Sequence, residues 1–439
     1  MRGRLVEYML TQLFKRYADS RDFIDRVIQT LFSKALLIMI SMLTGVIVAR
    51  ALGPDGRGEF AVIITVAALG AQFATLGLHS SNTYLLARNR SLLGRLIGNS
   101  LSVSIVVGSL AGVVAVAALA TGNSVDHVGE TSLWLIVAAV PTLTFLTLLR
   151  NLLLGLYETA RHNLAELGEK LLVLGFLSGL MVFDRMSPMT AFSGTLLASI
   201  AVAVVVARWL VVQSDGLSCS LNLLKENLGF SMRAYLSTLL FLLVARLDVI
   251  LVAHFLGEAQ TGLFAVAYGL GELLTMVAVV TGSIMFPYLA RESDRNVRWL
   301  FARRSVFVIG FIVSLIGLIS LPLASDMLVL LYGKSYEPGA SVYVFLVPGM
   351  IFLSISTILM NYFAAEGMPF IVVITPAIAL ITKLVLGMCW IPAHGINGAA
   401  VSLTMTYAVV LLVAAGYALA WCRRERTLRS DTVNQITSK

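Results

Sequence analysis

The sequence has little charge and few of the residues that build soluble active sites. Only 13% of its 439 residues are charged, whereas 58% are hydrophobic, and a water-soluble chain carries about 25% charged residues. The three cysteines, Cys219, Cys389 and Cys422, are odd in number and far apart, which excludes a disulfide framework and a cysteine-rich metal cluster. This composition predicts an integral membrane protein.

The sequence also lacks the motifs of nucleotide and metal chemistry. Its single Gly-Lys-Ser, at residues 333–335, has Leu328 where a phosphate-binding loop needs its first glycine. No His-Glu-x-x-His motif occurs, and the five histidines are scattered. We therefore expect no enzyme, no cofactor and no metal site. Without a nucleotide site, any energy that the protein needs would come from an ion gradient (H⁺ or Na⁺, both open), from the membrane potential or from consumption of its product.

Apolar runs long enough to cross a bilayer as helices recur along the chain. A spanning helix needs about 20 apolar residues, and continuous apolarity without alternation favours helices over a transmembrane barrel. The sequence therefore predicts an all-α integral membrane protein with about 12 transmembrane helices. The predicted spans are 31–52, 60–87, 96–120, 132–155, 164–183, 189–212, 229–256, 263–289, 306–323, 341–364, 370–392 and 395–421, with a short interfacial helix within 326–336.

The distribution of lysine and arginine predicts the orientation. Nearly all of these residues outside the spans fall on the side of the two termini, and the other side holds only Arg50, Arg57, Arg185 and Lys334. Basic residues accumulate on the cytoplasmic side of membrane proteins. We expect a multi-pass membrane protein with both termini in the cytoplasm. The net charge of +8 then reflects orientation, and no nucleic acid is expected as a partner.

The same pattern divides the chain into five segments. Residues 1–30 alternate basic and apolar side chains, which is typical of an amphipathic helix on an anionic membrane surface, although a plain cytoplasmic tail fits as well. A first six-helix bundle is predicted over 31–212 and a second over 229–422, joined by a cytoplasmic connector at 213–228. A cytoplasmic tail over 423–439 completes the chain.

Two stretches of the chain repeat one another. Residues 51–62 align with 255–266 at a constant offset, and a weaker match relates 170–175 to 383–387. An even number of spans in each copy makes the repeats parallel, as in transporters with two related bundles. We expect two pseudo-symmetric six-helix bundles around a central cavity. The identities in the first match are Leu52, Gly53, Gly58, Phe60, Ala61 and Val62 with Leu256, Gly257, Gly262, Phe264, Ala265 and Val266.

Ionisable residues deep in the predicted spans are the candidate binding groups, because they usually face a protein interior or a wet cavity. At 1.5 Å per residue, Arg246 and Asp248 lie about 15 Å below the outer surface. They are about 200° apart around one helix and cannot share a face. A cationic cavity suits an anionic ligand, because arginine and lysine bind anions. The predicted substrate-binding residues are Arg246, Lys383, Lys170, Asp248, Glu272 and Asn361.

Most of these candidates have a structural alternative. Arg246 could form an ion pair with Glu272, and Asp248 could pair with a neighbouring helix. Lys170 could pair with Glu166 or extend to the membrane surface. Asn361 could make a hydrogen bond between helices, which is the commoner role of an amide in a membrane.

Three stretches resemble bacterial polysaccharide (O-antigen type) flippases of the multidrug/oligosaccharidyl-lipid/polysaccharide exporter superfamily. They are residues 48–61, residues 246–268 and the Tyr-Gly-Lys-Ser-Tyr of 332–336. The resemblance extends over about 32–421. It implies twelve helices in two bundles that move an undecaprenyl-diphosphate-linked oligosaccharide from the inner to the outer leaflet by alternating access. It also implies a location in the bacterial inner membrane and a role in surface polysaccharide biosynthesis together with a polysaccharide polymerase or glycosyltransferases.

Other functions fit this resemblance less well. A lipid II flippase of the same superfamily usually carries two further C-terminal spans, which this sequence lacks. A cation-coupled multidrug exporter would need a site centred on carboxylates, whereas the deep charges here are mainly cationic. A membrane-bound glycan polymerase or ligase would need a long outward loop with acidic or histidine residues, and none is predicted.

Overall fold

The computed structural model describes residues 21–120, 130–292, 294–367 and 369–437, and every regular element within them is a helix. Most of the amphipathic segment predicted for 1–30 lies outside these residues. The elements are α2 (Arg21–Ala74), α3 (Leu78–Arg88), η1 (Arg90–Leu92), α4 (Leu93–Val103), η2 (Ser104–Gly108), α5 (Ser109–Ala120), α6 (Glu130–Gly155), α7 (Thr159–Val182), α8 (Pro188–Val211), α9 (Leu221–Leu256), α10 (Glu258–Arg291), α11 (Arg295–Ser320), α12 (Ala324–Tyr332), η3 (Lys334–Tyr336), α13 (Gly339–Ala365) and α14 (Ile371–Thr437).

The helices account for the twelve predicted spans. Nine helical stretches in the described residues are long and apolar enough to cross a membrane. Kinks at Gly53 and Gly395 divide two of the nine, α2 and α14, into two spans each. α7 adds the twelfth: it has 24 residues and packs against α2 and α8, although Glu166, Glu169 and Lys170 make it more polar than the others. The predicted all-α membrane fold is confirmed.

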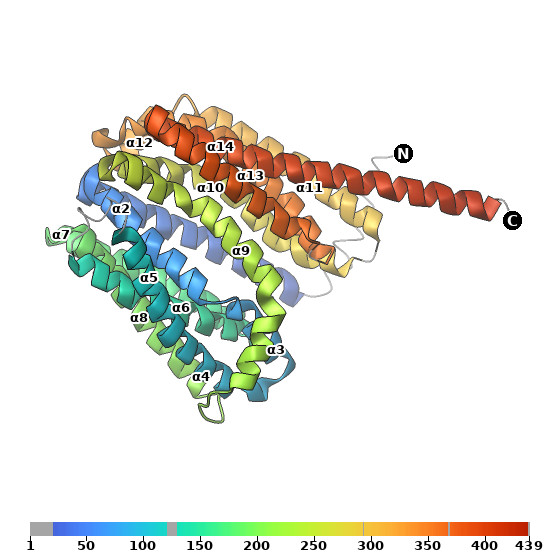
Figure 1. Cartoon of the computed structure of the whole chain (residues 1–439), viewed down its shortest axis with the longest axis horizontal. Helices are drawn as coiled ribbons and strands as arrows, with labels where there is room; N and C mark the ends of the chain where they lie inside the picture. The colour runs from blue at the N-terminus through green and yellow to red at the C-terminus, as the bar shows by residue number, and fades with distance from the viewer. Residues whose placement is uncertain (1–20, 121–129, 293, 368, 438–439) are drawn as a thin grey trace.

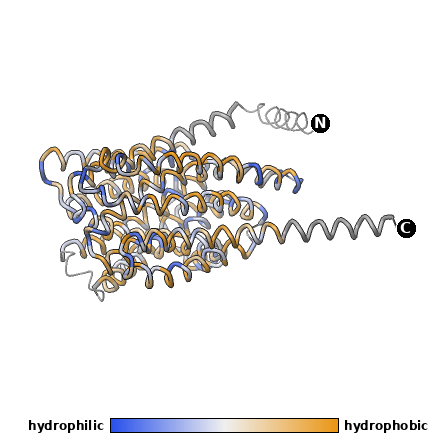
Figure 2. Tube along the Cα trace, turned by 90° about the horizontal axis from the view of Figure 1, so that it is seen from above, coloured by the Kyte–Doolittle hydropathy of each residue, from blue (hydrophilic) through white to orange (hydrophobic). Residues whose placement is uncertain are grey.

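The helices form two bundles, a first bundle of α2–α8 and a second of α10–α14 (Figure 1). α9 begins against the first bundle and then packs along α14 as part of the second. The two bundles approach each other near α12 and spread apart toward the other end. Hydrophobic residues extend along the helices and hydrophilic ones gather mainly toward the helix ends (Figure 2). Large apolar side chains such as Phe307 and Phe311 are 69% exposed, as expected of surfaces that lie in hydrocarbon. The chain is a multi-pass membrane protein.

The repeated turns bring the two bundles into contact, and we call this end of the molecule the turn end. Gly53 and Gly257 both adopt a left-handed φ, of 65° and 81°, with ψ near 180°, a conformation that glycine adopts without strain. A Cβ on Gly58 would lie 1.9 Å from the Glu258 carbonyl oxygen, and one on Gly262 would lie 1.9 Å from the Pro54 carbonyl oxygen. The two copies of the repeated stretch therefore pack against each other, and each glycine contacts the backbone of the other copy.

α9 is held by the first bundle at its start and by the second bundle farther along. The Asn227 side-chain amide donates to Asn82 Oδ1 at 2.6 Å, and the Tyr235 hydroxyl donates to the Phe73 carbonyl oxygen at 2.9 Å. The Ser237 hydroxyl, two residues later, donates to the Val372 carbonyl oxygen of α14 at 2.7 Å. Because α9 begins at Leu221, the second half of the connector predicted for 213–228 is helical.

We expect Gly58→Ala and Gly262→Ala each to lower the thermal unfolding midpoint of the detergent-solubilised protein. The added methyl group cannot fit against the facing carbonyl, and forcing atoms into a packed contact costs about 1–3 kcal/mol. Gly175→Ala is the matched control, because a Cβ there meets nothing within 4 Å and alanine favours a helix. Equal midpoints for all three variants would contradict the reciprocal contact.

Candidate functional site

A cavity of about 160 Å³ lies between the two bundles. Its walls come from both bundles, since α2 supplies one side and α10 and α12 the other. Polar groups make up a substantial part of its surface, and Arg57 and Glu272 are the charged ones. The lining residues are Ile38, Ser41, Met42, Gly45, Arg57, Ala265, Val266, Gly269, Glu272, Leu273, Met276 and Tyr332.

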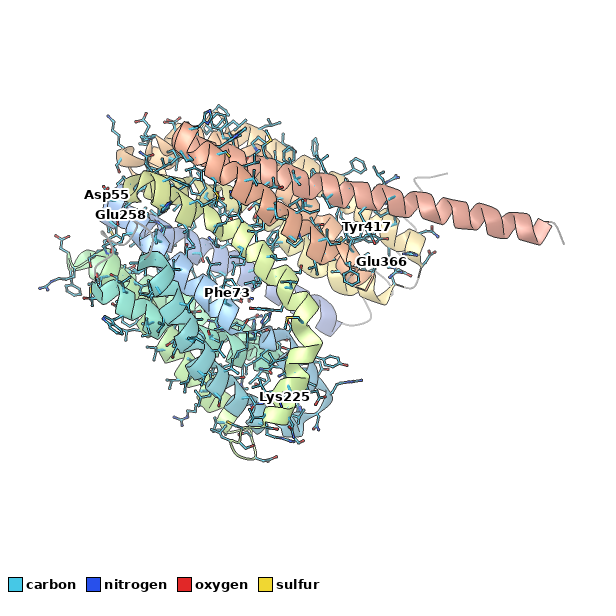
Figure 3. The ribbon with its side chains drawn as sticks, in the orientation of Figure 1. Asp55, Phe73, Lys225, Glu258, Glu366 and Tyr417 are labelled. Carbon is cyan, nitrogen blue, oxygen red and sulfur yellow. The ribbon has the colours of Figure 1, made fainter. Side chains whose placement is uncertain are left out.

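A second, larger hollow of about 510 Å³ lies between α2, α5 and α9. Its walls are apolar, with Val66, Leu110 and Ile250 among them, and no charged residue of the described chain lines it. Phe73 marks its place between α2 and α9 (Figure 3). This hollow offers no counter-charge for an ionic cargo, so the cavity between the bundles is the better candidate site.

Arg246 and Glu272 meet at the wall of the cavity. The Arg246 Nη2 atom lies 3.5 Å from Glu272 Oε1, and the guanidinium carbon lies 5.9 Å from the ring centre of Tyr268. The two side chains are 39% and 33% exposed. Arg246 therefore forms the ion pair named as its alternative, yet the pair stays accessible, and Glu272 itself lines the cavity. Binding of substrate by either residue stays a prediction.

Asp248 and Lys383 form an ion pair inside the second bundle. Asp248 on α9 contacts the Lys383 ammonium on α14, and their side chains are at most 1% exposed. Neither residue lines the cavity between the bundles. Arg246 and Asp248 do point to different neighbours, α10 and α14, as their separation around the helix predicts. Substrate binding by Lys383 or Asp248 stays a prediction, and this structure shows both engaged with each other.

Lys170 lies apart from this cluster. Its side chain is exposed on α7. The alternative for Lys170 was an ion pair with Glu166. Instead, Glu166 pairs with Lys34 of α2 at 3.0 Å. Glu169 pairs with Arg150 and accepts a hydrogen bond from the Ser199 hydroxyl at 2.7 Å. The acidic residues of α7 thus tie together the helices of the first bundle.

Asn361 is used in packing between helices. Its side-chain amide donates to the Thr357 carbonyl oxygen of its own helix at 2.8 Å. The same amide nitrogen lies 2.6 Å from where a Cβ on Gly282 of α10 would stand. Asn361 therefore sits at a close α10–α13 contact, and its predicted role in sugar binding is untested.

Arg57 is the cavity residue that the sequence did not single out. Its guanidinium carbon lies 5.7 Å from the ring centre of Phe60, and its buried Nε atom has no hydrogen-bond partner. Tyr332, Tyr336 and Arg246 lie near it. Among the described residues, no carboxylate forms an ion pair with Arg57. It is thus a cation at a cavity wall to which the described part of the chain supplies no paired carboxylate.

The repeat contains a signal that would have found Arg57. The offset that pairs Gly58 with Gly262 pairs Arg57 with Thr261. Thr261 is fully buried, and its hydroxyl donates to the Gly257 carbonyl oxygen at 2.8 Å. An arginine in place of a buried threonine, within an otherwise matching stretch, departs from what packing alone requires.

We expect Lys383→Met to destabilise the protein more than the double variant Asp248→Leu/Lys383→Met. Removing one partner leaves a buried charge uncompensated, at a cost of about 3–5 kcal/mol, whereas an apolar pair of similar volume is often neutral. Thermal unfolding of the single and double variants measures this difference. Arg161→Ala serves as control, because Arg161 pairs with Glu158 on an exposed surface, where an ion pair contributes about 0–1 kcal/mol. Additive losses in the double variant would contradict the pairing.

The fold resembles solved transporters. An inward-facing multidrug resistance MATE family transporter of the MOP superfamily superposes with a TM-score of 0.72 at 16% identity, over 90% of this chain and 96% of that one. An outward-facing MATE transporter gives 0.61 at 15% identity, over 91% and 96%. The lipid II flippase MurJ, in an inward closed conformation, gives 0.69 at 14% identity, over 89% and 86%. Identities this low show the fold alone.

The sequence comparisons give the family. None of the curated proteins matches the chain. A family model described as "Polysaccharide biosynthesis protein" matches residues 24–293, which is more than half of the chain. The two bundles, the cavity between them and this match agree with the resemblance seen in the sequence. The chain belongs to the polysaccharide biosynthesis protein family, whose structural neighbours are the transporters and flippases of the MOP superfamily.

Proposed function

We propose that the protein is a flippase that moves an undecaprenyl-diphosphate-linked oligosaccharide from the inner to the outer leaflet of the bacterial inner membrane, for surface polysaccharide biosynthesis. The family supports the glycan pathway, and the fold supports transport between two bundles. The observation that carries the proposal is Arg57, a cation at the wall of the cavity between the bundles with no counter-ion in the described chain.

The charges around the cavity suit a diphosphate. Arginine presents a planar fork that binds two phosphate oxygens at once. Arg57 comes from the first bundle, and Arg246 of α9 lies near it. Glu272 of α10 neutralises Arg246 at 3.5 Å. A diphosphate between the two arginines would compete with Glu272 for Arg246 and would give Arg57 its counter-charge.

The shape of the molecule suits loading from the cytoplasm. The bundles are in contact at the turn end and spread apart at the other end, where α14 projects beyond them (Figure 1). The predicted orientation puts that open end, and both termini, in the cytoplasm. Substrate would enter there, and the bundles would then rock about the site to expose it at the turn end. The coupling ion, H⁺ or Na⁺, and any polymerase or glycosyltransferase partner stay open.

We expect Arg57→Ala to weaken the binding of a short-chain polyprenyl diphosphate to the purified protein by about tenfold or more, since a hydrogen bond to a charged group contributes about 1.5–3 kcal/mol. Arg57→Lys should lie between wild type and alanine, because lysine keeps the charge and loses the fork. Arg185→Ala is the control, with an exposed arginine on the same side of the predicted topology. Isothermal titration calorimetry measures the affinities. Wild-type affinity in Arg57→Ala/Arg246→Ala would overturn the assignment.

The wider function is tested in cells that lack their own oligosaccharide flippase. We expect the wild-type gene to restore surface glycan and Arg57→Ala/Arg246→Ala to fail although the protein reaches the membrane. Rescue of cells depleted of their lipid II flippase would favour that substrate instead. Protection against cationic dyes without glycan delivery would favour a multidrug exporter and would contradict the proposal.

A further inference from the structure

A side chain of the first bundle caps the C-terminal end of a helix in the second bundle. Arg50, in α2, donates from Nε to the Leu331 carbonyl oxygen at 2.8 Å and from Nη2 to the Leu330 carbonyl oxygen at 2.5 Å. Both carbonyls belong to the last turn of α12, where helix carbonyls have no partner within the helix and carry partial negative charge. The guanidinium therefore satisfies two exposed acceptors across the boundary between the bundles.

A second hydrogen bond joins the same two segments. The Tyr336 hydroxyl, in η3 directly after α12, donates to the Ala49 carbonyl oxygen at 2.9 Å. Tyr336 is 1% exposed, and this burial raises the pKa of its hydroxyl, so that the group remains a donor across the physiological range. Ala49 and Arg50 are neighbours, so α2 and the α12–η3 segment are joined by three hydrogen bonds at one place.

The duplicated architecture does not require this connection. The offset of the repeat places His254 at the position that corresponds to Arg50. His254 is exposed, its ring lies 4.9 Å from that of its neighbour Phe255, and none of the hydrogen bonds of the described chain joins it to the first bundle. The two glycine contacts are reciprocal, whereas the Arg50 contact exists on one side only.

α12 also forms part of the candidate site. Tyr332, its last residue, follows Leu331 directly and lines the cavity with Arg57. The cavity of about 160 Å³ holds about five waters at 30 Å³ each, which is too little for a glycosylated diphosphate. Such a cargo would extend beyond the cavity, and its anionic group beside Arg57 would crowd Tyr332. α12 has nine residues and is a short element in the cavity wall.

We propose that Arg50 and Tyr336, with their acceptors on α12 and α2, form a latch that keeps the turn end closed while the cavity is empty. An anion drawn to Arg57 displaces Tyr332 and with it the last turn of α12, which releases the carbonyls of Leu330 and Leu331 from Arg50. The identity of that anion rests on the proposed function, whereas the latch itself rests on the three hydrogen bonds.

Distance measurement between spin labels tests the latch in the full-length protein in lipid nanodiscs. The labels replace Asp55 and Glu258, which lie side by side at the turn end (Figure 3), after serine replaces the native cysteines. The empty wild type should show one short distance, and a short-chain polyprenyl diphosphate should add a longer one. Arg50→Gln should show the longer distance without ligand, with its population raised about tenfold or more. Tyr336→Phe should show a smaller rise.

His254→Gln is the matched control, because it changes the corresponding position of the other repeat and should leave the distances unchanged. Arg57→Ala should keep the short distance when empty and lose the response to ligand. An unchanged distance distribution in empty Arg50→Gln, or a rise equal to that of His254→Gln, would overturn the latch. If no polyprenyl diphosphate binds even to the wild type, the proposed function fails, and the empty-state comparison still decides the latch.

Discussion

The structure depends on a place where two backbones meet without side chains between them. Gly58 and Gly262 let each repeated turn rest against a carbonyl of the other, with no room for a Cβ. This contact aligns the two bundles, closes one end of the space between them and leaves the other end spread (Figure 1). It also sets Arg57 and Tyr332 at the closed end of the cavity. One steric condition thus determines both the symmetry of the fold and the position of the site.

Several charges within the described helices are compensated locally. Lys383 pairs with Asp248 in the core, Arg150 pairs with Glu169, and the more exposed Lys34 pairs with Glu166. Such pairs are costly to bury and contribute little net stability, but they leave the helix interiors electrically neutral. Arg57 differs from these residues, because no carboxylate of the described chain forms an ion pair with it although it lines the cavity.

The helices and their duplication could be read from the sequence, because apolar length and repeated glycines are local properties. The position of Arg246, Asp248 and Lys383 far from the ends of their predicted spans could be predicted in the same way. Their partners did not, since the direction of a side chain around its helix depends on which helix packs there. Lys383 is enclosed within one bundle for this reason. Arg57 was placed in an outer loop because the sequence gives no sign that α2 resumes directly after Gly53.

The path of α9 has a mechanical consequence. The helix is bonded to α2 through Tyr235 and to α14 through Ser237, so the boundary between the two rigid bodies passes through a single helical turn. Any change in the angle between the bundles has to be absorbed there as curvature, as continuous helices absorb strain. Arg246 and Asp248 lie beyond that turn and travel with the second bundle, whereas Arg57 travels with the first. Rocking of the bundles therefore changes the separation of Arg57 and Arg246 directly. The affinity for an anion bound between them then differs between the conformational states.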